Sequence, residues 1–373
     1  MNKKILITST DLMMVQFLLS HVRNLAENGF DVEVACSDVG GRMGEVRKGL
    51  REYVRAIHTV RLVRSPLSIR NLTGYRDMRS IVNGGNYDII WTNEPVMGVV
   101  TRLAAKTARR KGTKVVYVVH GFHFYKGAPL INWMLFYPIE CLMGRYCDSV
   151  VTINCEDFRR AKKMRLPDVR FIHGIGINTE RLKPKRDQSN IRDELGINQN
   201  AFLVLSVGEL NRNKNQQVII RAITQINDKD IHYLLCGKGD QLEILRNMAI
   251  AAHIIDQVHF LGYRTDVVNI CSQSDLFVMP SRREGLPVAS LEAMYCGLPL
   301  LTARTRGLMD IMEDGRSGYM YDQDDAAGFA EGIRKLKAEP ELRKQMALRN
   351  HIVVRQYCID SVKREVLDVF SNE

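Results

Sequence analysis

Segment 281–299, SRREGLPVASLEAMYCGLP, carries residue types suited to binding an anionic ligand. Gly285 lets the backbone approach a ligand closely, and Pro287 suits the first turn of a helix, where free N–H groups favour an anion. Glu284 precedes this turn, and Glu292 follows on the predicted helix. The two carboxylates could bind different hydroxyls of one extended ligand, with its phosphates at the helix start. Glutamates near helix starts are also common on surfaces, because they favour the helix dipole.

Three upstream segments add cations and glycines that fit the same ligand. Segment 206–217, SVGELNRNKNQQ, places Arg212 and Lys214 after an apolar run. Cations there could neutralise a diphosphate as it leaves with its negative charge. LLCGKGD contributes Gly237, and FLGYRTD contributes Arg264, whose planar guanidinium could stack on a base. Each feature has a plainer alternative: a solvated charged loop, a lone G-x-G turn and a surface arginine.

Short apolar runs that recur between longer amphipathic segments predict an α/β fold. The runs are continuous rather than alternating, which is typical of parallel strands covered by helices on both faces. Ligands of such sheets bind beyond the carboxyl ends of the strands, where the segments above lie. The predicted strands are KKILITS, DVEVACS, YDIIWT, KVVYVVH, DSVVTIN, VRFIH, FLVLSVG, IHYLLCG, VHFLG and DLFVMP; the predicted helices include residues 16–28, 96–110, 215–226 and 241–252.

The polar stretch 181–200, RLKPKRDQSNIRDELGINQN, interrupts this pattern. A linker is predicted near residues 183–190, followed by a short helix. We therefore expect two Rossmann-like, doubly wound domains, residues 1–183 and 191–358. The last segment, about 359–373, has apolar residues at helical spacing and is expected to pack back on the first domain.

Composition indicates an ordinary globular protein of 373 residues, with 45% hydrophobic and 25% charged residues. Its eight cysteines lack C-x-x-C spacing, which favours reduced thiols over a zinc cluster or disulfide framework. The start, MNKKILITSTDLMMVQFLL, has polar residues in its apolar stretch and no small-residue cleavage site, so it predicts a strand and helix rather than a secretory signal. No run reaches the roughly 18 apolar residues of a spanning helix. A cytoplasmic protein is expected.

Charge is distributed unevenly along the chain. Residues 1–185 hold 30 Lys and Arg against 16 Asp and Glu, an excess of +14, whereas the remainder carries −3. A positive half could meet nucleic acid, anionic lipid or a phosphorylated substrate. A basic nucleic-acid-binding protein is thus an alternative of a different class. It would predict aromatic residues interleaved with Lys and Arg and a reading motif, and neither stands out, so no nucleic-acid partner is expected.

Segment 126–146, KGAPLINWMLFYPIECLMGRY, is apolar and aromatic and includes Trp133. It predicts a core helix. The alternative is an interfacial segment that touches lipid, with the basic clusters at 109–111 and 159–163 reinforcing attachment to anionic headgroups.

The order VGEL…K, CGKGD, LGYRTD and EGLPVASLEA resembles glycosyltransferase family 4, retaining enzymes of the two-domain GT-B fold whose domains face a central cleft. With VVHGFHFYKGAP at 118–129 and GIGINTERL at 174–182, the resemblance covers nearly the whole chain. Within the family, the chain is similar to bacterial enzymes that extend lipid-linked sugars for capsule, exopolysaccharide or glycoprotein assembly. The resemblance implies a UDP-sugar donor and a polyprenyl-phosphate-linked saccharide acceptor. It also fits peripheral attachment to the inner face of the cell membrane through the basic first domain.

The resemblance implies roles for single residues. Glu284 would hold the donor sugar, Glu292 would bind the ribose, and Lys214 would bind the diphosphate. Arg264 would lie beside the base, and His120 near the transferred sugar, at the mouth of the acceptor site. The donor would also contact the helix start and the G-x-G turn, at Gly285, Leu286, Pro287, Val288 and Gly237.

Two departures from the family pattern affect the expected site. Glu209 stands where many members have an arginine, and a carboxylate cannot neutralise a diphosphate, so Arg212 is expected to supply the second positive charge. The first loop, STDLMM, lacks the paired glycines often seen there and is expected to be shaped by the acceptor.

The resemblance also favours a mechanism of front-face substitution, because no carboxylate in these motifs is placed to attack the anomeric carbon. The β-phosphate of the donor would accept the proton of the acceptor hydroxyl, without a metal or cofactor. The histidines are dispersed, and His123, close to His120 in sequence, is expected to be structural. The rival enzyme is a UDP-sugar epimerase of the same architecture, which would need acid and base groups flanking the sugar.

Overall fold

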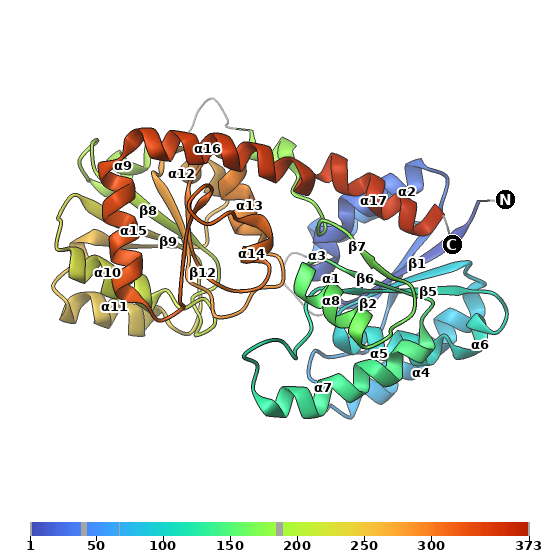
Figure 1. The fold of residues 1–373 in the computed structure, drawn as a ribbon. Helices are drawn as coiled ribbons and strands as arrows, with labels where there is room; N and C mark the ends of the chain where they lie inside the picture. The colour runs from blue at the N-terminus through green and yellow to red at the C-terminus, as the bar shows by residue number, and fades with distance from the viewer. Residues whose placement is uncertain (1, 39–42, 67, 184–188, 372–373) are drawn as a thin grey trace. The chain divides into compact units, whose positions relative to one another are not determined.

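A computed structural model of the chain divides it into two compact α/β units (Figure 1). It describes residues 2–38, 43–66, 68–183 and 189–371. The first unit comprises Met1–Gly176 and Ile359–Glu373, and the second comprises Ile177–Cys358. Most of the predicted linker, residues 184–188, lies outside the described residues.

The first unit is built on a seven-stranded parallel sheet, in the order β3-β2-β1-β4-β5-β6-β7. The predicted apolar runs form six of these strands, and β1 is buried at seven of its eight positions, as expected for a sheet covered on both faces. Only β3 was missed, because its residues are partly exposed and include a histidine. The strands are Lys4–Asp11 (β1), Asp31–Ser37 (β2), Ala56–Thr59 (β3), Ile89–Asn93 (β4), Lys114–Val119 (β5), Ser149–Thr152 (β6) and Val169–Phe171 (β7).

Helices cover both faces of this sheet (Figure 1). On one face α2 packs beside α17, which returns from the end of the chain, and Trp91 of β4 lies against Phe370, with ring centroids 5.0 Å apart. On the other face α4 and α5 cover a core that includes Tyr117. The helices are Leu12–Val15 (α1), Leu19–Glu27 (α2), Met43–Arg51 (α3), Arg70–Gly85 (α4), Pro95–Ala104 (α5), Lys106–Arg109 (α6), Leu130–Met143 (α7), Cys155–Lys163 (α8) and Ile359–Ser371 (α17).

The second unit has a six-stranded parallel sheet, in the order β10-β9-β8-β11-β12-β13. The four predicted runs form its first four strands. The structure adds β12 and β13, which follow the glutamate motif and are too short, at four residues each, to stand out by periodicity. The strands are Phe202–Val207 (β8), Ile231–Cys236 (β9), Val258–Gly262 (β10), Leu276–Met279 (β11), Leu300–Ala303 (β12) and Gly318–Tyr321 (β13).

The second sheet is also covered on both faces, so the predicted class of two Rossmann-like α/β domains is confirmed. One apolar core lies under α10, α11 and α15, and the other lies under α12 and α13. The helices are Ile191–Leu195 (α9), Gln217–Ile226 (α10), Leu242–Ala251 (α11), Val267–Gln273 (α12), Val288–Tyr295 (α13), Leu308–Ile311 (α14), Ala326–Ala338 (α15) and Pro340–Val354 (α16).

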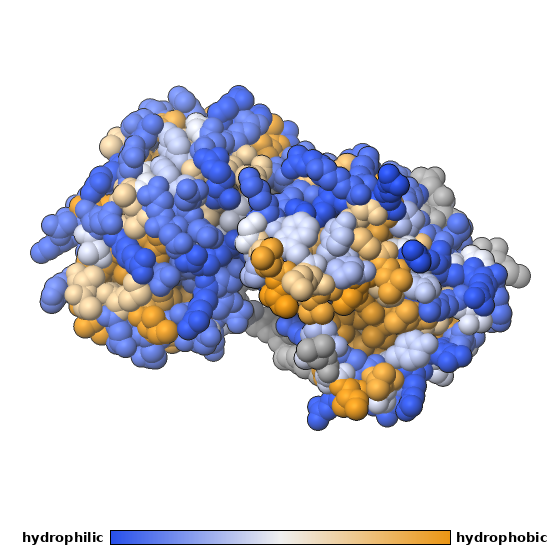
Figure 2. All heavy atoms as spheres, turned by 60° about the horizontal axis from the view of Figure 1, so that its bottom comes forward, coloured by the Kyte–Doolittle hydropathy of each residue, from blue (hydrophilic) through white to orange (hydrophobic). Residues whose placement is uncertain are grey.

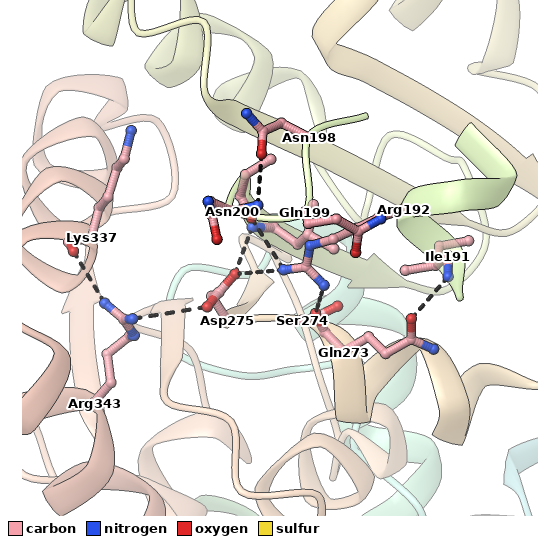
Figure 3. A network of polar contacts seen from close by, with 12 residues as sticks. Ile191, Arg192, Asn198, Gln199, Asn200, Gln273, Ser274, Asp275, Lys337 and Arg343 are labelled. Carbon is pink, nitrogen blue, oxygen red and sulfur yellow. Dashed lines mark hydrogen bonds and ion pairs between the residues drawn. The ribbon is translucent and has the colours of Figure 1, made fainter. Parts of the chain in front are cut away.

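A polar network fixes α9, the short helix expected after the linker (Figure 3). The Arg192 guanidinium donates to the Gln273 carbonyl (2.8 Å) and contacts the Asp275 carboxylate (3.4 Å). Gln273 accepts from the Ile191 N–H at 2.8 Å, and Arg343 approaches Asp275 at 3.8 Å. The network holds α9 against the C-terminal end of α12, and α9 carries Glu194, which pairs with Arg264.

In each sheet the order of the strands reverses at one defined point, although all strands are parallel. In the first unit, the chain moves outward from β1 on one side and from β4 on the other, and the same holds for β8 and β11 in the second. In open α/β sheets the carboxyl ends of two such strands leave a crevice in which ligands bind. A ligand is therefore expected to bind at the loops after β1, β4, β8 and β11.

The segment around α7 corrects the prediction of a core helix. It is a helix, but of its side chains only Glu140 and Met143 are buried, and several large apolar residues are exposed. The eight cysteines, all among the described residues, form no disulfide bond. Among the residues that the structure describes, no helix combines the length and apolar character needed to cross a membrane.

Candidate active site

The reversal point of the second sheet holds an ion pair between two predicted site residues. Lys214, in the loop after β8, places its Nζ 2.8 Å from Oε1 of Glu284, in the loop after β11. Their side chains are 21% and 11% exposed, so the pair is shielded yet reachable. A cation and a carboxylate thus meet at the crevice expected to bind a ligand.

Hydrogen bonds tie these two loops together. The Arg282 N–H donates to the Asn213 carbonyl at 2.8 Å, and the Asn213 amide donates to the Arg283 carbonyl at 3.0 Å. Asn215 is buried with a left-handed φ of 56°, and its amide donates to the Pro280 carbonyl, directly after β11, at 3.3 Å. Because the loops are cross-linked, the Lys214 and Glu284 side chains are positioned before any ligand arrives.

The Glu284 loop is also held from β12. Arg306 Nε donates to the Glu284 carbonyl at 3.1 Å. Gly307 has a φ of +75°, and a Cβ there would lie 2.2 Å from the Gly285 carbonyl oxygen, so only glycine fits. Pro287, predicted in the first turn, is instead the N-cap of α13, and the helix begins at the next residue, Val288. Gly285, Leu286 and Pro287 therefore lead directly into a helix N-terminus, where an anion is favoured.

Glu292 lies on α13, one turn beyond its start, and is half-buried. Burial raises the pKa of its carboxyl, and the positive charge of Arg181 offsets part of that shift. A half-buried carboxyl group with a raised pKa is typical of ligand-binding sites, although structural groups shift in the same way.

Gly237 has a structural reason to be glycine. A Cβ at this position would lie 1.8 Å from the Gly208 carbonyl oxygen, because the loops after β8 and β9 pack backbone to backbone. A Cβ at Gly239 would meet the Leu210 carbonyl at 2.1 Å. The G-x-G turn thus packs against the start of the Lys214 loop. A direct donor contact at Gly237 stays a prediction.

Arg264, after β10, is held by two carboxylates. Its guanidinium bonds Glu194 of α9 at 2.5 and 3.0 Å and Asp266 at 2.7 and 2.8 Å. These contacts occupy the edges of the guanidinium plane and leave its faces available to an aromatic ring. The arrangement is compatible with the predicted position beside a base.

Arg212 is exposed on the Lys214 loop, and within the described residues its side chain makes no hydrogen bond or ion pair. Glu209, the departure from the family pattern, is exposed and accepts a hydrogen bond from the Asn211 amide at 3.0 Å. Arg212 is thus available to supply the second cation, which stays a prediction.

The reversal point of the first sheet carries a second polar group. His120, after β5, has its Nε2 3.0 Å from Asn93 Oδ1, and burial lowers the pKa of its imidazole, partly offset by the charge of Glu94. Glu94, after β4, accepts from the Thr10 N–H at 2.6 Å and the Ser9 hydroxyl at 3.1 Å. The ends of β1, β4 and β5 therefore meet at one polar cluster around a neutral histidine.

Two expectations concern the surroundings of this cluster. His123 packs against Phe136 of α7, with ring centroids 4.7 Å apart, in keeping with the structural role expected for it. In the STDLMM loop, Asp11 caps α1 and pairs with Arg64 at 2.7 Å. Within the described ranges, no group of three or more His, Cys, Asp or Glu side chains is arranged to hold a metal ion.

The same architecture and motifs occur in known proteins. Residues 14–181 match the family described as Glycosyltransferase Family 4, and residues 187–350 match Glycosyl transferases group 1. The chain is 34% identical over its whole length to the EpsD protein of Bacillus subtilis (strain 168), which is named as a glycosyltransferase, and it covers 97% of that protein. The chain belongs to glycosyltransferase family 4.

Other relatives of this family 4 glycosyltransferase have more specific names. One is an Escherichia coli UDP-Gal:alpha-D-GlcNAc-diphosphoundecaprenol alpha-1,3-galactosyltransferase, 26% identical over 94% of this chain and 92% of that protein. Among solved structures, Anabaena Alr3699/HepE in complex with UDP and glucose superposes with a TM-score of 0.82, at 19% identity and full coverage of both chains. The latter likeness shows the shared GT-B fold.

Sequence reasoning missed one prominent residue of this glycosyltransferase. Glu94 has a φ of +65°, a strained conformation for a non-glycine residue and one that concentrates at functional sites. The available signal was its place between the buried strand IIWTN and Pro95, which begins α5. An acidic residue at such a strand-to-helix junction lies where α/β proteins bind ligands.

Proposed function

We propose that this glycosyltransferase transfers a hexose or N-acetylhexosamine from a UDP-sugar to a polyprenyl-phosphate-linked saccharide, with retention of anomeric configuration. The observation that carries the proposal is the Lys214–Glu284 pair at the reversal point of the second sheet, beside the N-terminus of α13. A cation, a helix start and a carboxylate match the diphosphate and the hydroxyls of a nucleotide sugar.

Relatives support this choice of substrates. The Escherichia coli relative is named for a UDP-galactose donor and a diphosphoundecaprenol acceptor. HepE was solved with UDP and glucose, and also with UDP-glucose. A lipid-linked acceptor fits an enzyme of surface polysaccharide synthesis, such as capsule or exopolysaccharide, working at the inner face of the membrane.

The proposed chemistry is a front-face displacement. The acceptor oxygen forms a bond to the anomeric carbon as the bond from that carbon to the β-phosphate oxygen breaks. The acceptor proton passes to a β-phosphate oxygen, and UDP leaves. Lys214 and Arg212 hold the negative charge that develops on the diphosphate, while Glu284 holds sugar hydroxyls and Glu292 binds the ribose. The protein contributes position and charge, and the scheme uses no metal.

In the first unit, His120 and Glu94 are the proposed acceptor-side groups. The lowered pKa of His120 leaves its ring neutral near pH 7, so it can donate or accept one hydrogen bond without attracting the diphosphate. Glu94 Oε2 is occupied by Thr10 and Ser9, which directs its second oxygen to an acceptor hydroxyl.

A UDP-sugar epimerase of the same architecture is the rival function. It would use the same donor site and no saccharide acceptor. The family match and the name of the Escherichia coli relative favour transfer.

The test combines the protein with a panel of UDP-sugars and an undecaprenyl-diphosphate-linked N-acetylhexosamine, followed by mass spectrometry and NMR of the product. The expected result is one added sugar with an α linkage from an α-linked donor, undiminished by EDTA. Glu284→Gln is the site variant, and Glu341→Gln, an exposed residue of α16, is the matched control. Epimerised UDP-sugar without a saccharide product, or an inverted linkage, would overturn the proposal.

A further inference from the structure

Helix α7 carries an unusual number of exposed apolar side chains. Leu130 is 80% exposed, Met134 75% and Ile131 64%, in a helix of 14 residues. Figure 2 shows hydrophobic side chains gathered on this face of the first unit, in the region of α7. The exposed large apolar residues of the helix are Leu130, Ile131, Met134, Leu135, Tyr137, Ile139 and Leu142. A contiguous patch of this kind marks an interaction surface rather than ordinary surface variation.

The helix is firmly anchored along its opposite side. Glu140 is buried and accepts from the Arg102 guanidinium and from the Tyr117 hydroxyl, both at 3.0 Å. Trp133 and Phe136 pack against the core of the first unit. Among the described residues of the first unit, no side chain covers the opposite side of α7, so its apolar face is open to a partner.

The neighbouring helix α8 is basic. The Arg160 guanidinium lies 4.6 Å from the centre of the Trp133 ring, which places α8 directly beside α7. Arg159, Lys162 and Lys163 of α8 are exposed. An apolar helix therefore lies next to a row of cations.

We propose that α7 lies in the surface of an anionic lipid bilayer, with its apolar face at the boundary of headgroups and acyl chains and the α8 cations on lipid phosphates. Apolar side chains flanked by Lys and Arg are the chemistry of interfacial helices. At about 1.5 Å per residue the helix is roughly 21 Å long, too short to span the hydrocarbon core of about 30 Å. A second copy of this chain is disfavoured, because pairing two α7 faces would also bring two basic α8 helices together.

This inference deepens the proposed membrane location by naming the element that makes the contact. Its test needs neither donor nor acceptor, so it can fail without the proposed transfer reaction failing. Vesicles of phosphatidylcholine alone, and vesicles that also contain about 30% of the anionic lipid phosphatidylglycerol, are sedimented with the full chain. The wild-type protein is expected to bind the anionic vesicles at least ten-fold more strongly, and added salt is expected to weaken binding.

Variants separate the apolar and charged contributions. Leu130→Gln with Met134→Gln is expected to lower the vesicle partition coefficient by about ten-fold per side chain, because each loses its burial in lipid. Lys162→Ala with Lys163→Ala is expected to remove most of the preference for phosphatidylglycerol. The matched control is Leu348→Gln with Ile352→Gln on α16, whose side chains are 66% and 58% exposed. This control is expected to bind vesicles like wild type.

A thermal melt checks that the first unit, which carries α7 and α8, is folded in each variant. UDP binding by calorimetry is expected to be unchanged. Equal vesicle binding by the α7 variant and the control would overturn the inference. So would a wild-type dimer, in sedimentation velocity, that the α7 variant converts to a monomer, since the face would then belong to a second copy. Retained UDP binding in either case would leave the proposed function standing.

Discussion

Replacing Lys214 by alanine should separate catalysis from stability. The Lys214–Glu284 pair is 2.8 Å long, with side chains 21% and 11% exposed. A partly exposed ion pair stabilises the fold by about 1 kcal/mol, and its loss lowers Tm by about 2–4 °C in a protein of this size. A cation that faces developing charge in a shielded site contributes more, about 2.7–4 kcal/mol, or 10²- to 10³-fold in rate. Lys214→Ala should therefore lose about 10²- to 10³-fold in kcat/KM with little loss of stability.

The assay follows UDP release with a saturating lipid-linked acceptor, alongside a thermal melt. Lys337→Ala is the control, because Lys337 pairs with Asp228 at 2.6 Å in the same unit with comparable exposure, 28% and 36%. It should show a similar Tm decrease and unchanged kcat/KM. The reasoning is refuted if Lys214→Ala stays within three-fold of wild type, or if Lys337→Ala loses as much activity.

Three further predictions concern single groups. Burial raises the pKa of Glu292, so its charged form destabilises the fold, and Glu292→Gln should raise Tm at pH 8 but not at pH 4. The same variant should weaken UDP binding in calorimetry, and an unchanged affinity would count against the ribose role. Burial lowers the pKa of His21 to about 4, so the free energy of unfolding of the first unit, from urea titrations, should fall by about 3 kcal/mol as the pH falls from 6.5 to 4. His21→Gln should remove this dependence on pH. Gly237→Ala should leave little folded protein, because its Cβ would overlap the Gly208 carbonyl; normal expression and melting would contradict the packing.

Much of the fold and part of the site could be predicted from sequence. Continuous apolar runs reveal parallel strands because burial on both faces is a local property of composition. Lys214 and Glu284 could be assigned to one crevice because parallel strands present their carboxyl ends at the same edge. Pairing partners could not be predicted, since Arg264 and Glu194 are 70 residues apart and meet only because α9 is held by Arg192.

The backbone strain at Glu94 and the exposure of α7 could not be predicted from the sequence either. The sequence TNEP does not predict the positive φ of Glu94. That backbone conformation accompanies hydrogen bonds from Thr10 and Ser9, more than 80 residues earlier. The apolar sequence of α7 matches that of a buried helix. Whether another element covers it depends on the tertiary arrangement, and here its apolar side stays exposed.

Because the chain returns to the first unit at its end, only the second unit is encoded by one continuous segment. The second is one uninterrupted stretch, 177–358, and can be cloned as such, whereas 1–176 alone lacks the closing helix. That fragment would leave Trp91 without Phe370, and the turn at Gly176 without Ile359, whose Cα lies 2.8 Å from the point that a Cβ on Gly176 would occupy. A nonsense mutation within the codons of α17 would consequently damage the unit that is encoded at the start of the sequence.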